Sequence, residues 1–313
     1  MFSVGQTILG VYVVEKFLGA GGAGEVFLVR RVLDDKQYAV KMVHSKNVES
    51  TRLRQDLLRE IRVSEALGDH PHIVPVRFFR MIEGNLAVFS DYVDGGSLQN
   101  WIRAGKILQL QNLLDLAIQI AWGLEAVHRG GIIHKDIKPA NILMETFGQV
   151  RVADFGLIRG MTPAYCSPEQ MCDEPLTTAT DIWSLALVVI YMWLGERKWD
   201  LGPNGAMALN HLKKESNKLG VAPGSLIDLL EKCLSNEPSE RPLTALMVAE
   251  SLKDIYREVT GVEFPLPDPP EIDPSTSSST AGPGRSSLVD GMKLEDPREL
   301  VKRLPMLLDV LSM

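Results

Sequence analysis

The sequence predicts an α+β fold with two lobes, a small antiparallel sheet followed by a helical lobe, with a cleft between them. Three observations support this prediction. Strand-like runs rich in Val, Tyr and Phe occupy the first part of the chain, up to about residue 93. Helical periodicity takes over after Gly95 and Gly96. An apolar content of 45% in 313 residues is enough for a sizeable core.

The predicted sheet begins with three strands between residues 8 and 43. Their sequences, YVVEKFL, EVFLVRRV and QYAVKMV, are separated by a glycine cluster and by the turn-prone run DDK. Residues 50–67 repeat apolar side chains at helical spacing and stop at Gly68, so one amphipathic helix is expected next. The segments IVPVRFF and LAVFSDYV are two further strand candidates that complete the sheet.

The predicted helical lobe contains a long helix from about Leu108 to His128. Apolar side chains recur there with a 3.6-residue period, and Gly130 and Gly131 end the pattern. This helix would support the loop that begins at His134. Further helical patterns occupy residues 167–173, 181–194, 206–217, 225–234 and 243–258.

Charge and cysteine content argue against several classes of protein. The chain has 33 basic and 40 acidic residues and a formal net charge of −7, so no general attraction to nucleic acid or anionic lipid is expected. Its three cysteines show no metal-binding spacing and suit a reducing, cytoplasmic location.

We find no secretory signal. The most apolar stretch, 182–194, is shorter than the ~20 residues needed to cross a bilayer, so we expect a buried helix.

Five short motifs follow one another along the chain: GAGGAG from Gly19, YAVK ending at Lys41, HKDIKPAN from His134, DFG from Asp154 and SPE from Ser167. Glycines let backbone N–H groups approach phosphates closely. A strand pattern rather than a helix follows the glycine motif, which argues against a dinucleotide-binding fold. Together the motifs supply the polar groups needed to hold a metal-bound nucleotide and pass its terminal phosphoryl group to a hydroxyl.

With these motifs in this order, the chain resembles the eukaryotic-type (Hanks-type) protein kinases of the serine/threonine class. The motifs SPEQ and KPAN resemble those of bacterial members of this family. The resemblance covers residues 8–258 and implies a bilobal protein-kinase fold with an N-lobe at 8–90, a hinge at 91–95 and a C-lobe at 96–258. It also implies ATP in the cleft, Mg²⁺ as the metal with Mn²⁺ as an alternative, and Ser or Thr hydroxyls of proteins as acceptors.

The predicted catalytic groups lie mainly in HKDIKPAN. A hydroxyl nucleophile needs a carboxylate to accept its proton, and Asp136 would provide it. Lys138 would neutralise charge on the moving phosphoryl group, while Asn141 and Asp154 would offer oxygen atoms to the metal. The resemblance adds Thr162 as a contact of the catalytic Asp and Lys.

Two ion pairs are expected from the same resemblance. Lys41 would pair with Glu60 and align the phosphates of the nucleotide, with Glu65 as the lesser candidate for its partner. Glu169 of SPE and Arg241 would form a buried pair that anchors the substrate platform, and loss of one partner would cost about 3–5 kcal/mol.

The nucleotide is expected to contact the glycine-rich loop, aliphatic side chains of both lobes and the hinge. The resemblance assigns the adenine contacts to Asp91 C=O and Val93 N–H, and it makes Ser90 the gatekeeper. Asp181 is expected to hold the catalytic loop through backbone amides. The full predicted nucleotide-binding set is Leu18, Gly19, Ala20, Gly21, Gly22, Ala23, Gly24, Val26, Ala39, Lys41, Ser90, Asp91, Val93 and Leu143.

Departures from the family pattern bear on regulation. Lys135 replaces an arginine that usually receives an activation-loop phosphate, and lysine lacks the bidentate fork. The short segment LIRGMTPAYC after DFG offers Thr162 as its one Ser or Thr. We therefore hypothesise that activity needs no phosphorylation of this loop. At Ser64, where kinases usually place an apolar residue against Phe155, the hydroxyl either weakens that stack or bonds back to its own helix.

The last part of the chain has a different composition. Residues 262–290 are rich in Pro and Ser and are predicted to form a linker, followed by a helical tail of unknown role at 291–313. The run STSSST in the linker is a candidate self-substrate. Two alternatives stay open for this tail: it docks on the kinase-like domain, or it leads into a further domain after residue 313.

Two other functions stay open at this point. A small-molecule kinase shares the constellation of Asp136, Asn141 and Asp154 but ordinarily lacks a platform such as MTPAYCSPE. A pseudokinase scaffold would bind nucleotide or partners without turnover. Such scaffolds normally lose the equivalents of Lys41, Asp136 or Asp154, all of which are present here. The transfer of phosphate to protein distinguishes these functions.

Overall fold

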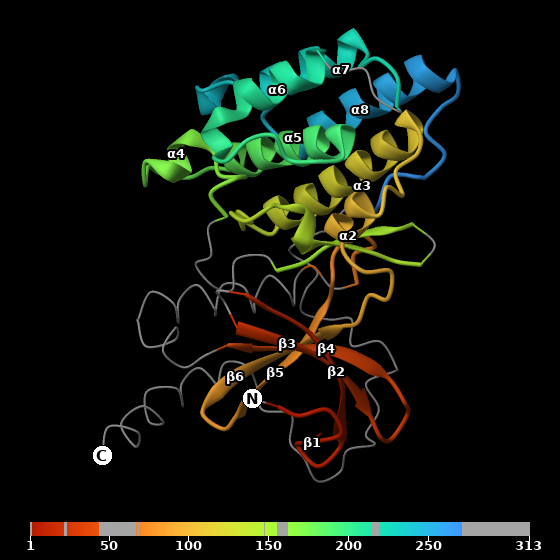
Figure 1. Ribbon diagram of the computed structural model, residues 1–313, viewed down its shortest axis with the longest axis vertical. Coiled ribbons are helices and arrows are strands. Elements are labelled where there is room, and N and C mark those ends of the chain that lie inside the picture. The colour runs from red at the N-terminus through yellow and green to blue at the C-terminus, as the bar shows by residue number, and fades with distance from the viewer. Residues whose placement is uncertain are drawn as a thin grey trace.

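The six-stranded sheet and the helices lie in separate lobes, as the sequence predicts (Figure 1). The computed structural model describes residues 2–21, 24–43, 67, 69–146, 148–154, 162–214 and 219–270. One lobe is a six-stranded antiparallel sheet with the strand order β1-β2-β3-β4-β6-β5. Its strands are β1 (Thr7–Ile8), β2 (Tyr12–Gly21), β3 (Gly24–Arg31), β4 (Gln37–Val43), β5 (Val76–Ile82) and β6 (Asn85–Asp91). The predicted meander and the two further strands are confirmed.

The register of the sheet separates two faces, because successive side chains of a strand point to opposite sides. Val26 pairs with Lys41, and Ala39 pairs with Ser90, so these four side chains share one face. All four are partly exposed. The opposite face is buried and contains Phe27, Val29, Val40 and Phe89. The sheet therefore keeps one face for its core and presents Lys41 on the other.

The second lobe is helical, and every helix predicted within the described part of this lobe is confirmed to within a few residues. Helix α3 packs against α5 and α8 around a single large core. The apolar stretch 182–194 lies in α5, whose residues are buried almost throughout, as predicted. The helices are α2 (Leu98–Arg103), α3 (Leu110–Arg129), α4 (Pro168–Met171), α5 (Ala179–Leu194), α6 (Gly205–Lys214), α7 (Gly224–Cys233) and α8 (Ala245–Thr260).

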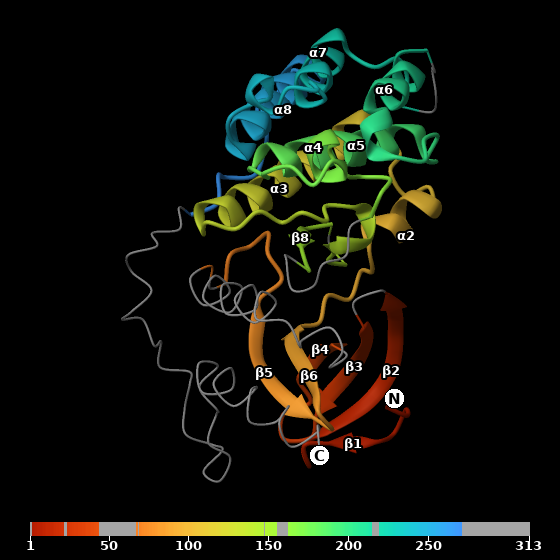
Figure 2. The same cartoon turned by 90° about the vertical axis from the view of Figure 1, so that its left-hand side faces the viewer.

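Two small elements of this lobe are absent from the prediction. Helix α2 is capped by Ser97, whose hydroxyl accepts a hydrogen bond from the Asn100 N–H. The hairpin of β7 (Ile142–Met144) and β8 (Val150–Val152) lies between the helices and the sheet of the first lobe (Figure 2). It directly follows the short 3₁₀ helix η2 (Pro139–Asn141), and it therefore sets the end of the predicted catalytic loop.

The segment after α8 returns along the helical lobe. Its residues 262–270 belong to the predicted linker, yet Phe264 is only 8% exposed and packs on Trp122 and Tyr256 with ring centroids 5.6 and 5.2 Å apart. Among the described residues no helix is long and apolar enough to span a membrane. The predicted helix at 50–67, apart from Leu67, and the chain from 271 onward, including the tail at 291–313, lie outside the described residues.

Candidate active site

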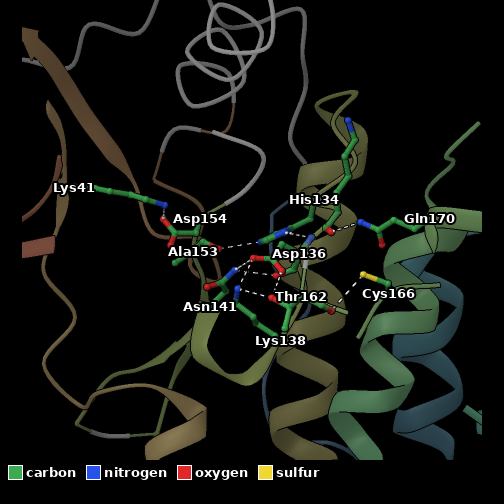
Figure 3. A network of polar contacts seen from close by, with 11 residues as sticks. Lys41, His134, Asp136, Lys138, Asn141, Ala153, Asp154, Thr162, Cys166 and Gln170 are labelled. Carbon is green, nitrogen blue, oxygen red and sulfur yellow. Dashed lines mark hydrogen bonds and ion pairs between the residues drawn. The ribbon is translucent and has the colours of Figure 1, made fainter. Parts of the chain in front are cut away.

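The loop after α3 brings Asp136 and Lys138 together with Thr162 (Figure 3). Asp136 Oδ1 accepts a hydrogen bond of 2.7 Å from Thr162 Oγ1, and Asp136 Oδ2 accepts one of 2.5 Å from Lys138 Nζ. Lys138 Nζ also donates to Thr162 Oγ1 at 2.8 Å. The three side chains form a closed triangle, which fixes the direction of the carboxylate.

Asn141 joins this triangle and connects it to the DFG segment. Its Nδ2 atom donates to Asp136 O at 2.9 Å and to Asp136 Oδ2 at 3.1 Å. The backbone N–H of Ala153 donates to the Asn141 carbonyl at 2.9 Å. Because Nδ2 uses its hydrogens on Asp136, the amide oxygen of Asn141 is left as the acceptor that faces away from this network.

Asp154 and Lys41 link the two lobes directly. Lys41 Nζ donates to Asp154 Oδ1 at 2.8 Å, and the two side chains are 15% and 41% exposed. Asp154 has φ +60°, an uncommon left-handed conformation that aims its carboxylate at β4. Desolvation alone would raise the pKa of the Asp154 carboxyl, but the charge and hydrogen bond of Lys41 outweigh it and hold the pKa below its usual value.

The oxygen atoms left over at Asn141 and Asp154 fit a small divalent cation. Asp154 Oδ1 is bound to Lys41, whereas no described group donates to Asp154 Oδ2 or to the amide oxygen of Asn141. Mg²⁺ prefers oxygen ligands and is held in proteins by one or two such groups, with water and phosphate completing the shell. The described residues contain no cluster of three or more His, Cys, Asp or Glu that would hold a metal without such help.

Asp181 holds the start of the catalytic loop through backbone N–H groups, as predicted. Its two carboxylate oxygens accept hydrogen bonds from the backbone N–H groups of His134 at 2.7 Å and Lys135 at 2.8 Å. Lys135 has φ +68°, and its side chain is exposed. Burial alone would raise the pKa of Asp181, but the hydrogen bond from His128 at 2.8 Å, with other donors, holds it below its usual value.

The platform beside the loop is anchored by the predicted pair of Glu169 and Arg241. Two parallel hydrogen bonds of 2.7 and 2.9 Å join them, and the side chains are 4% and 0% exposed. The guanidinium also lies 4.9 Å from the ring centre of Trp183. Burial opposes ionisation of Glu169, yet the hydrogen bond from Arg241 leads the interactions that lower its pKa to about 2.

The predicted adenine-contact side chains come from both lobes: Val26 and Ala39 share the sheet face of Lys41, and Leu143 lies in β7. Val26, Ala39 and Leu143 are partly exposed, and Leu18 is 37% exposed. Ser90 Oγ donates to Ala39 O at 3.3 Å, so the hydroxyl of the predicted gatekeeper is used within the sheet.

The predicted hinge residues differ in how they are held. Val93 is buried, whereas the Asp91 carboxylate is tied back by Arg77, with 2.8 Å between Asp91 Oδ1 and Arg77 Nε.

The glycine-rich loop is only partly described. Gly19, Ala20 and Gly21 end β2, and Gly24 begins β3. Gly24 has φ +147°, and a Cβ atom there would lie 1.9 Å from Met42 O. This glycine is therefore required by the close approach of β4.

Several predicted site residues cannot be placed in this way. Gly22, Ala23, Glu60, Glu65, Ser64 and Phe155 lie outside the described residues, so the expected pair of Lys41 with Glu60 stays a prediction.

Sequence reasoning missed two residues that hold the loop. His128, at the end of α3, bonds Asp181, and Gln170 Nε2 donates to Lys135 O at 2.7 Å. No local pattern marks either residue, because their partners lie far along the chain.

Comparison with known proteins decides the family. The model of the protein kinase domain matches residues 12–252, inside the range predicted from the motifs. The chain belongs to the protein kinase family. A crystal structure of the Mycobacterium tuberculosis PknI kinase domain, a C20A mutant, has the same fold, with a TM-score of 0.65 at 25% identity over 81% of this chain and 98% of that one.

Curated relatives in this family include bacterial proteins named serine/threonine-protein kinases. PknK of Mycobacterium bovis is 30% identical over 271 residues, which cover 80% of this chain and 24% of that protein. PrkC of Bacillus subtilis is 26% identical over 81% of this chain and 42% of that protein. The chain thus spans about a quarter to less than half of the length of these relatives.

Proposed function

We propose that this chain transfers the terminal phosphoryl group of ATP to Ser or Thr hydroxyls of protein substrates. The observation that carries the proposal is the Asp136 carboxylate, held by Thr162 and Lys138 within the lobe whose Asp154 meets Lys41 across the cleft. A carboxylate with fixed direction, a nearby ammonium and a cation site are the groups that phosphoryl transfer to a hydroxyl needs. The names of the curated relatives agree with this activity.

Each group has a defined task in the proposed reaction. Asp136 accepts a hydrogen bond from the acceptor hydroxyl and takes its proton as the oxygen bonds to phosphorus. Lys138 neutralises negative charge on the transferred phosphoryl group. ADP is the leaving group, and its β-phosphate keeps the oxygen that bridged it to the transferred phosphorus. Lys41 contacts the phosphates, with Glu60 as its proposed second partner. Because these groups are placed before the reaction, little reorganisation is needed during transfer.

Asp154 and Asn141 would hold Mg²⁺, or Mn²⁺ as an alternative, through their unused oxygen atoms. When bound, the cation neutralises charge on the phosphate oxygens and orients them for transfer. The two segments that carry these oxygen atoms lie side by side. Ala153, the residue before Asp154, donates its N–H to the Asn141 carbonyl. The proposed nucleotide site also includes the partly exposed side chains of Val26, Ala39 and Leu143 and the backbone of the predicted hinge.

The proposed enzyme needs no phosphate on its activation loop. Thr162 is the one Ser or Thr of LIRGMTPAYC, and its hydroxyl both donates to Asp136 and accepts from Lys138. A phosphate ester at Thr162 would remove the donated hydrogen and place negative charge beside a carboxylate. Asp181 and Gln170 instead hold the loop at Lys135 through backbone contacts.

The proposed setting is the cytoplasm, with other proteins as substrates. ATP chemistry and three free cysteines, Cys166, Cys172 and Cys233, suit a reducing compartment. The run STSSST at 275–280 remains a candidate self-substrate, and mass mapping of phosphate on the chain would test it.

Transfer of radiolabelled phosphate from ATP to a generic protein substrate tests the proposal. Wild type is compared with Asp136→Ala and Asp154→Ala, and intact mass follows phosphate on the chain itself. We expect incorporation by wild type alone. Equal incorporation by all three proteins would overturn the catalytic assignment, and no incorporation by wild type would favour a scaffold. Stoichiometric loop phosphate, together with loss of turnover after phosphatase treatment, would overturn the independence from loop phosphorylation.

A further inference from the structure

A group of three buried aromatic rings lies next to the proposed acceptor site. The turn that follows Thr162 is closed by a 2.9 Å hydrogen bond from Tyr165 N to Thr162 O. The Tyr165 ring contacts Trp199, which contacts Tyr191, with centroids 6.3 and 6.4 Å apart. Trp199 Nε1 donates to Ala164 O at 2.7 Å. The group therefore connects the end of α5 rigidly to the residue that orients Asp136.

Two exposed arginines flank this aromatic group. Arg197 donates from Nη1 to the carbonyls of Trp199 and Asp200, the latter at 3.3 Å. Arg103 follows Gln99 by one turn of α2, and Gln99 Nε2 donates to the Tyr191 hydroxyl at 2.5 Å. Arg103 and Arg197 thus lie on two segments, α2 and the segment after α5, that both contact this aromatic group.

Electrostatics agrees with this placement. Burial, followed by the neighbouring Tyr191, raises the pKa of the Tyr165 phenol, and the charges of Arg197 and Arg103 both oppose the rise. Both guanidiniums therefore act on a ring that lies three residues from Thr162.

Neither arginine has a carboxylate partner among the residues that the structure describes. The nearby Glu196 pairs with Lys198 at 3.2 Å, and Asp200 offers Arg197 its carbonyl rather than its side chain. Other described arginines, such as Arg30, Arg77 and Arg151, are paired with acids. In a chain of net charge −7, two unpaired cations beside an acceptor site indicate an anionic partner.

We infer that the preferred acceptor segment carries an anionic side chain near its Ser or Thr, held by Arg103 and Arg197. The anion is a carboxylate of Asp or Glu, or the phosphate of a phosphoserine placed by an earlier kinase. This inference rests on the proposed function, because it describes the segment that would enter the same site. A basic flanking side chain would meet like charge there and would be disfavoured.

Matched peptides test the inference with the full chain. Each carries one acceptor Ser flanked on both sides by Glu, Gln, Lys or phosphoserine, and kcat/KM is measured. We expect the Glu peptide to exceed the Gln peptide by about 3- to 10-fold, the range for two exposed charge pairs. The ratio should shrink between about 0.05 M and about 0.5 M salt. The phosphoserine arm distinguishes the two sources of the anion.

The variant Arg103→Gln/Arg197→Gln should bring the ratio of Glu to Gln peptides close to one. Gln keeps a donor for the carbonyls that Arg197 bonds. The matched control is Arg257→Gln, an exposed arginine of α8 that is paired with Asp254, and it should leave the ratio unchanged. Equal use of the Glu and Gln peptides by wild type would overturn the inference, as would an unchanged ratio in the double variant.

A binding measurement separates this inference from the proposed function. Fluorescence anisotropy follows the same peptides with Ala in place of Ser, so that no turnover is needed. Preferential binding of the Glu peptide that is lost in the double variant would support the arginine site, whether or not the chain transfers phosphate. Absence of phosphate transfer would overturn the proposed function but not the arginine site. Equal binding of the Glu and Gln peptides would overturn the arginine site.

Discussion

Thr162 donates a hydrogen bond of 2.7 Å to Asp136 and accepts one of 2.8 Å from Lys138, although the three residues come from two separate segments. The Thr162 carbonyl is fixed as well, since it accepts from Tyr165 N at 2.9 Å and Cys166 Sγ at 3.3 Å. Thr162 thus joins the platform to the catalytic loop and acts on the acceptor through Asp136. We regard it as a positioning residue.

Replacement of Thr162 by Val should lower kcat by about 10- to 100-fold, because a hydrogen bond to a charged group contributes about 1.5–3 kcal/mol. The KM for ATP should change little, since the described residues that Thr162 bonds are not in the predicted nucleotide-binding set. Thr162→Ser keeps the hydroxyl and should recover most of the rate. Steady-state kinetics of the three proteins checks this, and a Thr162→Val enzyme with wild-type kcat would contradict the role.

Replacement of Asp181 by Asn should destabilise the protein and slow transfer. The buried carboxylate accepts from two backbone N–H groups and from His128, and an amide has one acceptor oxygen, so at least one donor loses its partner. We expect a loss of about 1–3 kcal/mol in the free energy of unfolding, measured by urea titration.

Asp115→Asn is the matched control for Asp181→Asn. Burial raises the pKa of Asp115, whose recorded partner is Gln119 at 2.8 Å, so this carboxylate gains little from its charge. The control should be neutral or stabilising. Equal destabilisation by the two substitutions would show that the backbone contacts of Asp181 carry no special weight.

The sequence predicted the elements of this fold better than their detailed partners. Strand and helix periodicity is local, and it located β2 to β6 and the long helices within a few residues. Helix α2 was missed because its six residues are too few for a periodic pattern. The hairpin of β7 and β8 was missed for the same reason.

The site shows the same division. Asp136, Lys138 and Asn141 share one loop, so their proximity could be inferred directly from the sequence. Glu169 and Arg241 meet across 72 residues, and their pairing was predicted from family resemblance alone. His128 and Gln170 carry no local signal, because one sequence does not state which distant polar groups a fold brings together.

Removal of Arg241 should be among the most damaging single changes. Arg241→Met would leave the Glu169 carboxylate buried without its cation, which costs about 3–5 kcal/mol. The double variant Glu169→Gln/Arg241→Met removes both charges and should be more stable than Arg241→Met. Thermal and urea unfolding of the single and double variants measure the difference, and a double variant less stable than Arg241→Met would contradict the explanation.

Acid should weaken the wild-type protein through the same pair. The folded pKa of Glu169 is about 2, below its ordinary value of 4.5, so its contribution to stability is complete above pH 4.5 and is lost as the pH falls toward 2. Urea unfolding at a series of pH values should show this loss in wild type. The slope in this range should be smaller in Glu169→Gln/Arg241→Met, and an identical slope would assign acid sensitivity to other carboxyl groups.

Phe264 should stabilise the helical lobe although it lies beyond α8, in the segment predicted as a linker. Its ring is 8% exposed and packs on Trp122. The ring centroid of Trp122 in turn lies 5.4 Å from that of His72, in the loop before β5. Phe264→Ala should therefore cost about 3 kcal/mol or more in the free energy of unfolding. Leu266→Ala, at a position 42% exposed in the same segment, should cost less than about 0.5 kcal/mol. Urea titration distinguishes the two variants, and equal effects would mean that the segment contributes no specific packing.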